Sequence, residues 1–160
     1  MARPKGSRRH RRVREAAAPR YPPGAPQPEL TGVVLDSDVI IEILRGRAAT
    51  LAAALALEQS SVPTFCTPIA WAEVYAGARP AEEALTRAFF EARGEVVLDG
   101  NVGRHAGGYL ARYARSHGME IADALVAAAA SLSGMRLWTL NRKHYPMEDV
   151  RFFEPPSARP

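Results

Sequence analysis

The acidic pair Asp36 and Asp38 stands directly behind a run of aliphatic residues, Val33-Val34-Leu35. Such a run is typical of a strand buried on both faces, and such strands belong to parallel α/β sheets, whose ligands bind beyond the carboxyl ends of the strands. Asp36 falls at that end, so the strand would deliver a carboxylate into a crevice. Ser37 is a suitable N-cap for the following helix, and a purely structural interpretation, in which both acids only cap this turn, stays open.

Three further polar residues, Glu73, Asp123 and Asn141, stand beside apolar segments farther along the chain. Two of them have a plain structural interpretation: a lone Glu in an apolar helix usually faces solvent, and a carboxylate in the first turn of a helix gains from the helix dipole. If the acids met in one crevice, two carboxylates about 5 Å apart would repel by roughly 3 kcal/mol at an effective dielectric constant of about 20. Such a cluster would need bound protons or a cation.

The apolar pattern predicts the elements that would position these side chains. Short runs of Val, Ile and Phe indicate strands, and longer Ala- and Leu-rich segments bounded by Gly, Pro, Ser or Thr indicate helices. The resulting order, β-α-α-β-α-α-β-α-α-β-β, predicts an α/β fold with a mostly parallel central sheet of four to five strands flanked by helices. Strands are predicted over 32–36, 62–66, 95–98, 136–140 and 150–153, and helices over 38–45, 48–58, 68–78, 80–93, 101–117 and 120–132.

Composition favours one globular domain in a reducing compartment. A chain of 160 residues, with 47% hydrophobic and 24% charged residues, can bury one core. The single cysteine, Cys66, has no partner for an internal disulfide, which fits a cytoplasmic protein. No stretch approaches the roughly 20 apolar residues that span a bilayer, and prolines follow the basic N-terminus where a signal peptide would be apolar. We therefore expect neither secretion nor association with a membrane.

Charge divides the chain into a tail and a body. Residues 1–30 hold eight Lys or Arg and two Glu, a net charge of +6, whereas the remainder has a net charge of −2. The tail is also rich in proline and poor in aliphatic residues, so it cannot bury enough surface to offset its ordering entropy. We predict a disordered basic tail at 1–30, a folded domain at 31–155 and a flexible end at 156–160. The tail could contact phosphates without sequence preference or be an extension without function.

Four sequence blocks resemble a known family. In their order and intervals they are similar to the motifs of PIN domains and, in detail, to those of VapC-type toxins from VapBC toxin–antitoxin pairs. The resemblance covers residues 32–154 and implies a PIN-like three-layer sandwich. The blocks are LDSDVII at 35–41, AEVYAG at 72–77, IADALVA at 121–127 and WTLN at 138–141.

The resemblance implies a ribonuclease that depends on Mg²⁺ or Mn²⁺. On that interpretation Asp36 and Asp123 hold the metal, Glu73 orients or deprotonates the attacking water, and Asn141 supplies an oxygen ligand or a hydrogen bond. Asp38 would be an accessory residue of the helix start. Carboxylate oxygens suit these cations, whereas the scattered histidines and the lone cysteine do not suit zinc. Many PIN domains carry a fourth acid at the position of Asn141, so the amide here weakens any second metal site.

Two other functions compete with this interpretation. An apolar strand followed by Asp-Ser-Asp also opens the haloacid-dehalogenase-like phosphatases, in which the first Asp is the nucleophile. Thr139 and Lys143 could imitate two later motifs of that fold, but only Glu148-Asp149 follows them, without room for the intervening strand and helix. A non-catalytic module that binds RNA or a partner, with structural acids, is the second alternative.

The resemblance also implies partners. VapC-type toxins usually form homodimers and are inhibited by a VapB antitoxin. An inhibitor would act most directly by inserting a basic side chain among Asp36, Glu73 and Asp123, because an arginine can pair with carboxylates bidentately and compete with the cation. The selection of one RNA over another depends on surface shape and loop contacts and cannot be read from the acids.

Overall fold

A computed structural model describes residues 32–156 of the chain. The predictions for the tail at 1–30 and for almost all of the end at 156–160 lie outside the described residues. Within the described part, the element order alternates strands with pairs of helices, as the sequence pattern predicted.

The central sheet has four parallel strands in the order β3-β2-β1-β4. Strand β1 lies inside the sheet and pairs with both β2 and β4, so the end of β1 is flanked by two neighbouring strand ends. The strands are β1 (Val33–Leu35), β2 (Thr64–Cys66), β3 (Gly94–Glu95) and β4 (Arg136–Trp138).

A fifth strand over 150–153 does not form. Only an isolated bridge joins Phe152 to Leu137 of β4, with hydrogen bonds from the Leu137 amide to the Arg151 carbonyl (2.7 Å) and from the Phe153 amide to the Leu137 carbonyl (2.8 Å). Pro155 and Pro156 follow at once, and proline has no amide hydrogen with which to extend a strand ladder.

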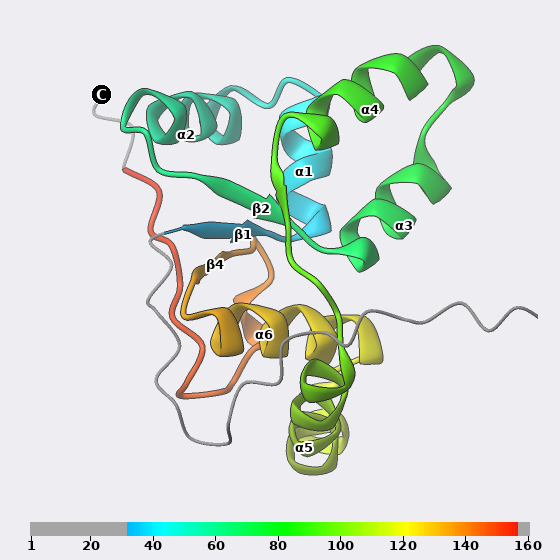
Figure 1. Cartoon of the computed structure of the whole chain (residues 1–160), viewed down its shortest axis with the longest axis vertical. Coiled ribbons are helices and arrows are strands. Elements are labelled where there is room, and N and C mark those ends of the chain that lie inside the picture. The colour runs from blue at the N-terminus through cyan, green and yellow to red at the C-terminus, as the bar shows by residue number, and fades with distance from the viewer. Residues whose placement is uncertain (1–31, 157–160) are drawn as a thin grey trace, which may run out of the picture.

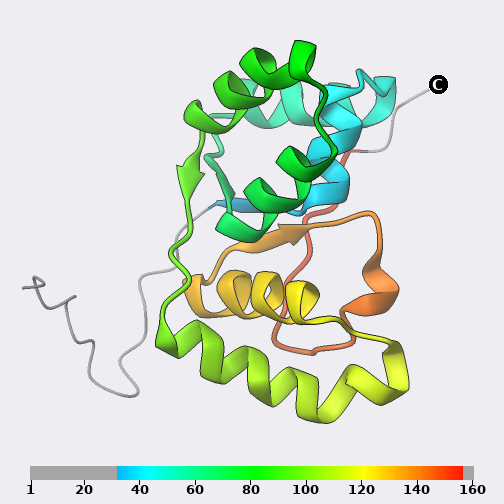
Figure 2. The same ribbon diagram turned by 90° about the vertical axis from the view of Figure 1, so that its right-hand side faces the viewer.

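Helices cover both faces of the sheet, which gives the expected three-layer arrangement. Helices α1 to α4 lie on one face and α6 on the other (Figure 1), and α5 packs along the outer side of α6 (Figure 2). The α-helices are α1 (Ser37–Leu44), α2 (Ala48–Gln59), α3 (Pro68–Gly77), α4 (Glu83–Glu91), α5 (Gly100–His117) and α6 (Ile121–Ser133); the short 3₁₀ helices are η1 (Pro80–Glu82) and η2 (Arg142–His144).

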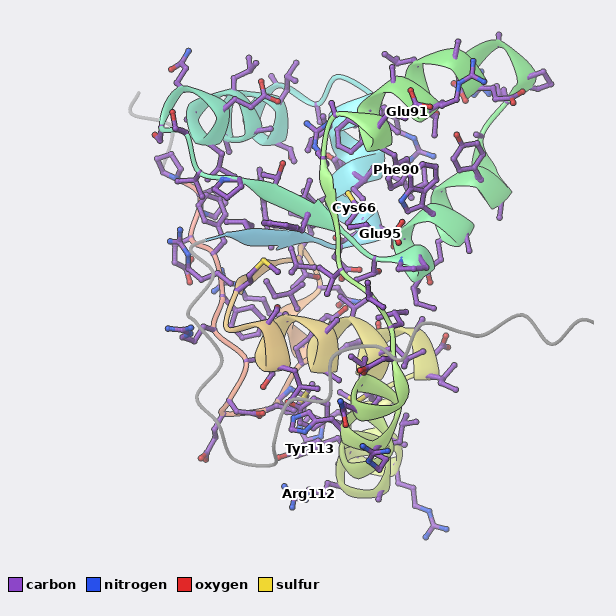
Figure 3. The ribbon with its side chains drawn as sticks, in the orientation of Figure 1. Cys66, Phe90, Glu91, Glu95, Arg112 and Tyr113 are labelled. Atoms are coloured by element: carbon purple, nitrogen blue, oxygen red, sulfur yellow. The ribbon has the colours of Figure 1, made fainter. Side chains whose placement is uncertain are left out.

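Each face of the sheet has its own core. Cys66 and Phe90 lie in the upper layer between the sheet and the helices (Figure 3), and the Trp71 ring stacks on Phe90 with centroids 4.3 Å apart. On the opposite face α6 presents the alanines 127–130, each at most 1% exposed, which allow its backbone to approach the sheet closely. This close approach sets the position of the first turn of α6 relative to the end of β1.

Among residues 32–156 no helix combines the length and the apolar character needed to cross a membrane.

Candidate active site

The four predicted site residues line one polar cavity of about 110 Å³. It lies beyond the carboxyl ends of β1 and β4, where a parallel sheet places its ligands. Loops and helix ends from four separate parts of the chain contribute to it, so the fold brings together residues up to 105 positions apart in the sequence. The lining residues are Asp36, Ser37, Asp38, Glu73, Ala122, Asp123, Val126 and Asn141.

Asp36 is the one buried carboxylate in the described part of the chain, with 8% of its surface exposed. It is the N-cap of α1, a role that the sequence had suggested for Ser37: its Oδ1 accepts a hydrogen bond from the Ser37 amide at 2.9 Å. Its Oδ2 accepts one from the Tyr145 hydroxyl at 2.7 Å. Burial raises the pKa of Asp36, and the hydrogen bonds from Tyr145, Thr139 and Ser37 offset only part of that rise.

Asp38 connects the first turn of α1 to the loop behind β4. Its Oδ2 accepts hydrogen bonds from the Leu140 amide (3.0 Å) and the Thr139 hydroxyl (3.3 Å). Burial, followed by the charge of Asp36, raises the pKa of Asp38 to about 6. Its Oδ1 is buried and has no hydrogen-bond partner, which is uncommon for a buried oxygen and marks a position where a cation would be favoured. Asp38 therefore does more than cap the helix.

Asp123 is fixed at the start of α6. Its Oδ2 accepts a hydrogen bond from the Glu120 amide at 3.0 Å, which caps the helix, and lies 3.3 Å from Nδ1 of His144. The same ring nitrogen is 3.1 Å from the side-chain amide of Asn141. Asp123 therefore caps the start of α6 and at the same time lines the cavity with its carboxylate.

Glu73 reaches the cavity from α3, which lies on the opposite face of the sheet from α6, the helix that carries Asp123. Glu73 is exposed to solvent, whereas Asp36 is buried. An exposed carboxylate is already in contact with solvent water.

Two residues that were not predicted from the sequence also contact site carboxylates: His144 contacts Asp123 and Tyr145 contacts Asp36. His144 is the last residue of η2 and Tyr145 follows it. The apolar periodicity of the sequence did not indicate this short turn. The segment Asn141-Arg142-Lys143-His144-Tyr145 is polar and follows a strand end, which is a signal of a site, but nothing in it shows which carboxylate each side chain would meet.

The donor chemistry of the cavity fits a hard divalent cation. Carboxylate and amide oxygens suit Mg²⁺ or Mn²⁺. Within residues 32–156, however, no group of three or more His, Cys, Asp or Glu side chains is arranged to hold a metal ion on its own. Mg²⁺ is typically held by one or two carboxylates and completes its shell with water and substrate phosphate. The cavity, with the unpartnered Oδ1 of Asp38, matches that kind of site.

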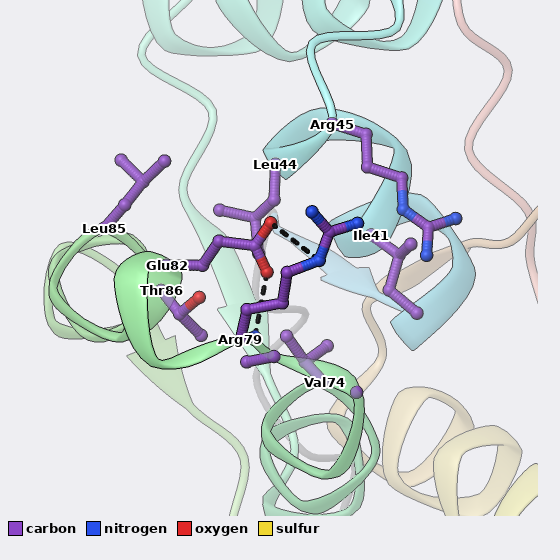
Figure 4. A pocket seen from close by; sticks show the side chains of 10 residues that line it. Ile41, Leu44, Arg45, Val74, Arg79, Glu82, Leu85 and Thr86 are labelled. Atoms are coloured by element: carbon purple, nitrogen blue, oxygen red, sulfur yellow. Dashed lines mark hydrogen bonds and ion pairs between the residues drawn. The ribbon is translucent and has the colours of Figure 1, made fainter.

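A second hollow, of about 120 Å³, has both apolar and charged lining residues and lies between α1, α3 and the η1–α4 segment (Figure 4). Ile41, Leu44 and Val74 form its floor, and Arg79 on its rim forms an ion pair with Glu82 at 4.0 Å. It contains one acid, Glu82, which is already paired, so it lacks the groups for hydrolysis. Helices α1 and α3 border both hollows.

The chain is similar to known proteins over most of its length. Residues 33–150 match the family described as "PIN domain". The chain is 32% identical over 130 residues to "Ribonuclease VapC10" of Mycobacterium tuberculosis, covering 80% of this chain and 95% of that protein. It is 30% identical over 115 residues to "Ribonuclease VapC19" of the same organism, covering 71% and 92% of the two chains.

Solved structures share the fold. A DNA-bound VapBC from Salmonella typhimurium matches with a TM-score of 0.64 and 19% identity, covering 76% of this chain and 96% of that one. A toxin–antitoxin complex from Klebsiella pneumoniae matches with a TM-score of 0.60 and 20% identity, covering 74% and 95%.

Proposed function

The chain belongs to the PIN domain family, and on that premise we propose that it is a metal-dependent endoribonuclease that acts as the toxin of a type II toxin–antitoxin pair. The chain is 30–32% identical to two relatives that are named ribonucleases, and the similarity extends over nearly the whole length of those relatives. The observation that carries the proposal is the cavity itself, in which four separate chain segments place Asp36, Glu73, Asp123 and Asn141 around one polar space. Hydrolysis of RNA phosphodiester bonds is the reaction that this set of groups supports.

Asp36 and Asp123 are the residues that would hold the cation, Mg²⁺ or Mn²⁺. Such a cation, when bound, polarises the phosphate and lowers the pKa of a coordinated water. Asp38 adds its unpartnered Oδ1 to the negative potential of the cavity, which concentrates cations there. Asn141 offers an amide group whose orientation His144 can fix by its contact at 3.1 Å.

Glu73 is the residue that would orient or deprotonate the attacking water. It lines the cavity and is exposed, so it can contact water from bulk solvent. A general base has to lie within hydrogen-bond reach of the water from which it takes the proton, and a separate carboxylate outside the buried cluster is suited to that task.

A cleavage assay tests the proposal. The full chain, incubated with a mixture of short single-stranded RNAs and Mg²⁺ or Mn²⁺, should cleave RNA, and Asp36→Asn and Asp123→Asn should each reduce the rate by at least 100-fold. Glu91→Gln, a change of an exposed carboxylate on α4, is the matched control and should retain the full rate. Rates in the Asn variants equal to the wild-type rate would refute the assignment of these acids. A folded protein that binds RNA without cleaving it would favour the non-catalytic alternative.

A VapB-type antitoxin is the expected partner, and the wild-type toxin is expected to form a homodimer in the cytoplasm. The similar solved structures are described as toxin–antitoxin complexes. The hollow of Figure 4, whose lining combines Ile41, Leu44 and Val74 with charged residues, suits an amphipathic segment of the antitoxin. Because α1 and α3 border both hollows, that segment would lie next to the acids. A basic side chain of the antitoxin could then pair with Asp36, Glu73 or Asp123 in place of the cation.

Inhibition by such an antitoxin should weaken as Mg²⁺ is raised. Co-expression with the adjacent gene, followed by sizing of the complex and cleavage assays over a range of Mg²⁺ concentrations, measures both features. A monomer whose activity does not respond to the neighbouring gene product would refute the toxin–antitoxin proposal and leave the nuclease proposal standing.

A further inference from the structure

Tyr145 contacts Asp36 from a distant part of the chain. Its hydroxyl donates to Oδ2 of Asp36 at 2.7 Å, across 109 positions of sequence. The Tyr145 residue is 3% exposed and Asp36 is 8% exposed, so water does not compete freely for this hydrogen bond. A charge-assisted hydrogen bond in such surroundings is stronger than a neutral one.

The backbone before Tyr145 is held at two points. The His144 amide donates to the Asn141 carbonyl at 3.1 Å, and the Tyr145 amide donates to the Arg142 carbonyl at 2.9 Å. The Tyr145 ring packs edge-on against Phe152, with centroids 6.4 Å apart, in the core on the α6 side of the sheet. The hydroxyl therefore has a fixed position under the end of β1.

A hydroxyl at this position needs a polar partner. A buried hydroxyl without a hydrogen bond costs about 1–3 kcal/mol, so a phenylalanine would fill the same apolar space at lower cost if packing were the only requirement. The short distance to Oδ2 of Asp36 shows that the phenolic O–H of Tyr145 is the donor in this hydrogen bond. Asp36 is its acceptor.

Both oxygens of Asp36 are thereby restrained. The Ser37 amide holds Oδ1 and the Tyr145 hydroxyl holds Oδ2, so rotation of the carboxylate would break one bond or the other. A carboxylate has about four acceptor positions, so after the hydrogen bonds from Ser37, Tyr145 and Thr139 one position is left to face the cavity that Asp36 lines. Ligand groups that are held by hydrogen bonds of this kind bind metals more tightly than free ones.

We propose that Tyr145 is a positioning residue of the cation site, whose hydroxyl fixes the Asp36 carboxylate in the orientation that binds the metal; this inference rests on the proposed function. Tyr145 itself touches neither the cation nor the RNA. It acts through Asp36, so its removal should weaken metal binding first and reduce the cleavage rate only through that loss.

Tyr145→Phe in the full chain tests this proposal, with Tyr109→Phe as the matched control. Tyr109 is similarly buried, at 4% exposed, and its hydroxyl also donates to an aspartate, Asp149, at 2.5 Å, but neither residue lines the cavity. Mn²⁺ binding is measured by calorimetry at a temperature where circular dichroism shows all three proteins to be folded. Tyr145→Phe should raise the dissociation constant about 10-fold. Tyr109→Phe should leave it within twofold of wild type.

Cleavage rates over a range of Mn²⁺ concentrations provide a second readout. The rate of Tyr145→Phe should approach that of wild type when Mn²⁺ saturates the site, which a variant with general structural damage would not do. An unchanged dissociation constant in Tyr145→Phe would overturn the proposal, as would tighter binding, which would mean that the hydroxyl competes with the cation.

Failure of the proposed function gives a different result from failure of this inference. Wild-type protein that binds no Mn²⁺ would refute both, whereas wild-type binding with an unaffected Tyr145→Phe refutes only the role of Tyr145. If the variant does not fold, a crystal structure of the wild-type protein with Mn²⁺ decides. A Tyr145 hydroxyl that still donates to the metal-bound Asp36 supports the role, and one displaced from Asp36 overturns it.

Discussion

Asp149 joins three parts of the fold that pack on the α6 side of the sheet, and its replacement tests how the segment carrying His144 and Tyr145 is held. Its Oδ2 accepts hydrogen bonds from Tyr109 of α5 (2.5 Å) and Ser131 of α6 (2.8 Å), and lies 3.2 Å from Nε2 of His105. Partial burial acts to raise the pKa of Asp149, but these hydrogen bonds more than offset it, so the pKa lies below its ordinary value of 3.8.

Asp149→Ala should lower the free energy of unfolding by about 2–3 kcal/mol. The substitution removes the acceptor shared by Tyr109, Ser131 and His105, and leaves the buried Tyr109 hydroxyl only its contact with Nε2 of His105 at 2.9 Å; a lost hydrogen bond to a charged group costs about 1.5–3 kcal/mol. Tyr109→Phe should lower the free energy of unfolding by about 1–2 kcal/mol. It removes only one of the donors to Asp149, whose side chain is 50% exposed and can be hydrated instead. Once Asp149 is gone, Tyr109→Phe should cost less than it does in the wild type, because the hydrogen bond to Asp149 is already lost and only the contact with His105 remains.

Urea unfolding of the wild type, both single variants and the double variant measures this coupling. A loss of 2–3 kcal/mol corresponds to a fall in melting temperature on the order of 10 °C for a domain of this size. The effect should depend on pH with a known sign. Because the folded-state pKa of Asp149 is lowered, its stabilisation is fully present above about pH 5 and is lost as pH falls through the folded-state pKa. Additive losses in the double variant, or a wild-type advantage that does not decrease as the pH is lowered, would refute this account of the cluster.

Further predictions concern the site and the core. Glu73→Gln should reduce kcat by at least 100-fold while Mn²⁺ affinity measured by calorimetry changes less than threefold, since Glu73 acts on water; a parallel loss of affinity would make it a ligand instead. Removal of divalent cations by a chelator should abolish cleavage, and added Mn²⁺ should restore it; chelator-resistant cleavage would contradict the proposed mechanism. Cys66 should resist alkylation at pH 8 in native protein and react after unfolding, because burial raises its pKa to about 12; rapid native modification would contradict its placement in the core. Trp71→Ala should cost about 3–4 kcal/mol in urea unfolding through loss of its stacking on Phe90, and a cost below 1 kcal/mol would mean that this stack is not part of the core.

Most of the elements could be predicted because their signals are local. The apolar run at 33–35 and the Thr67-Pro68 helix start identified β1 and α3, and the Thr67 hydroxyl does cap α3 by accepting from the Ala70 amide at 3.2 Å. The prediction of a strand at 150–153 was wrong. An edge strand and an unpaired extended segment have similar sequence patterns, and only the sheet edge that the segment meets decides whether it pairs along its length or forms an isolated bridge.

The site could be predicted as a set of residues but not as a network. The four blocks that resemble PIN-domain motifs singled out Asp36, Glu73, Asp123 and Asn141, and all four line one cavity in the structure. Asp38 was expected to serve only the helix start, whereas its contacts reach Thr139 and Leu140, about 100 positions away. Contacts of that range carry no periodic signal in the sequence.

The sequence by itself determined the alternation of strands and helices, the family, and the acids available for chemistry, since each follows from residue type and interval along the chain. The tertiary structure decided which oxygen of each acid is already engaged. It paired Asp36 with Tyr145 and Asp123 with His144, and it left Oδ1 of Asp38 without a partner. The physical reason is that η2 becomes fixed only when β4 pairs with β1 and its following segment packs against the α6 side, so these partners exist only in the folded chain.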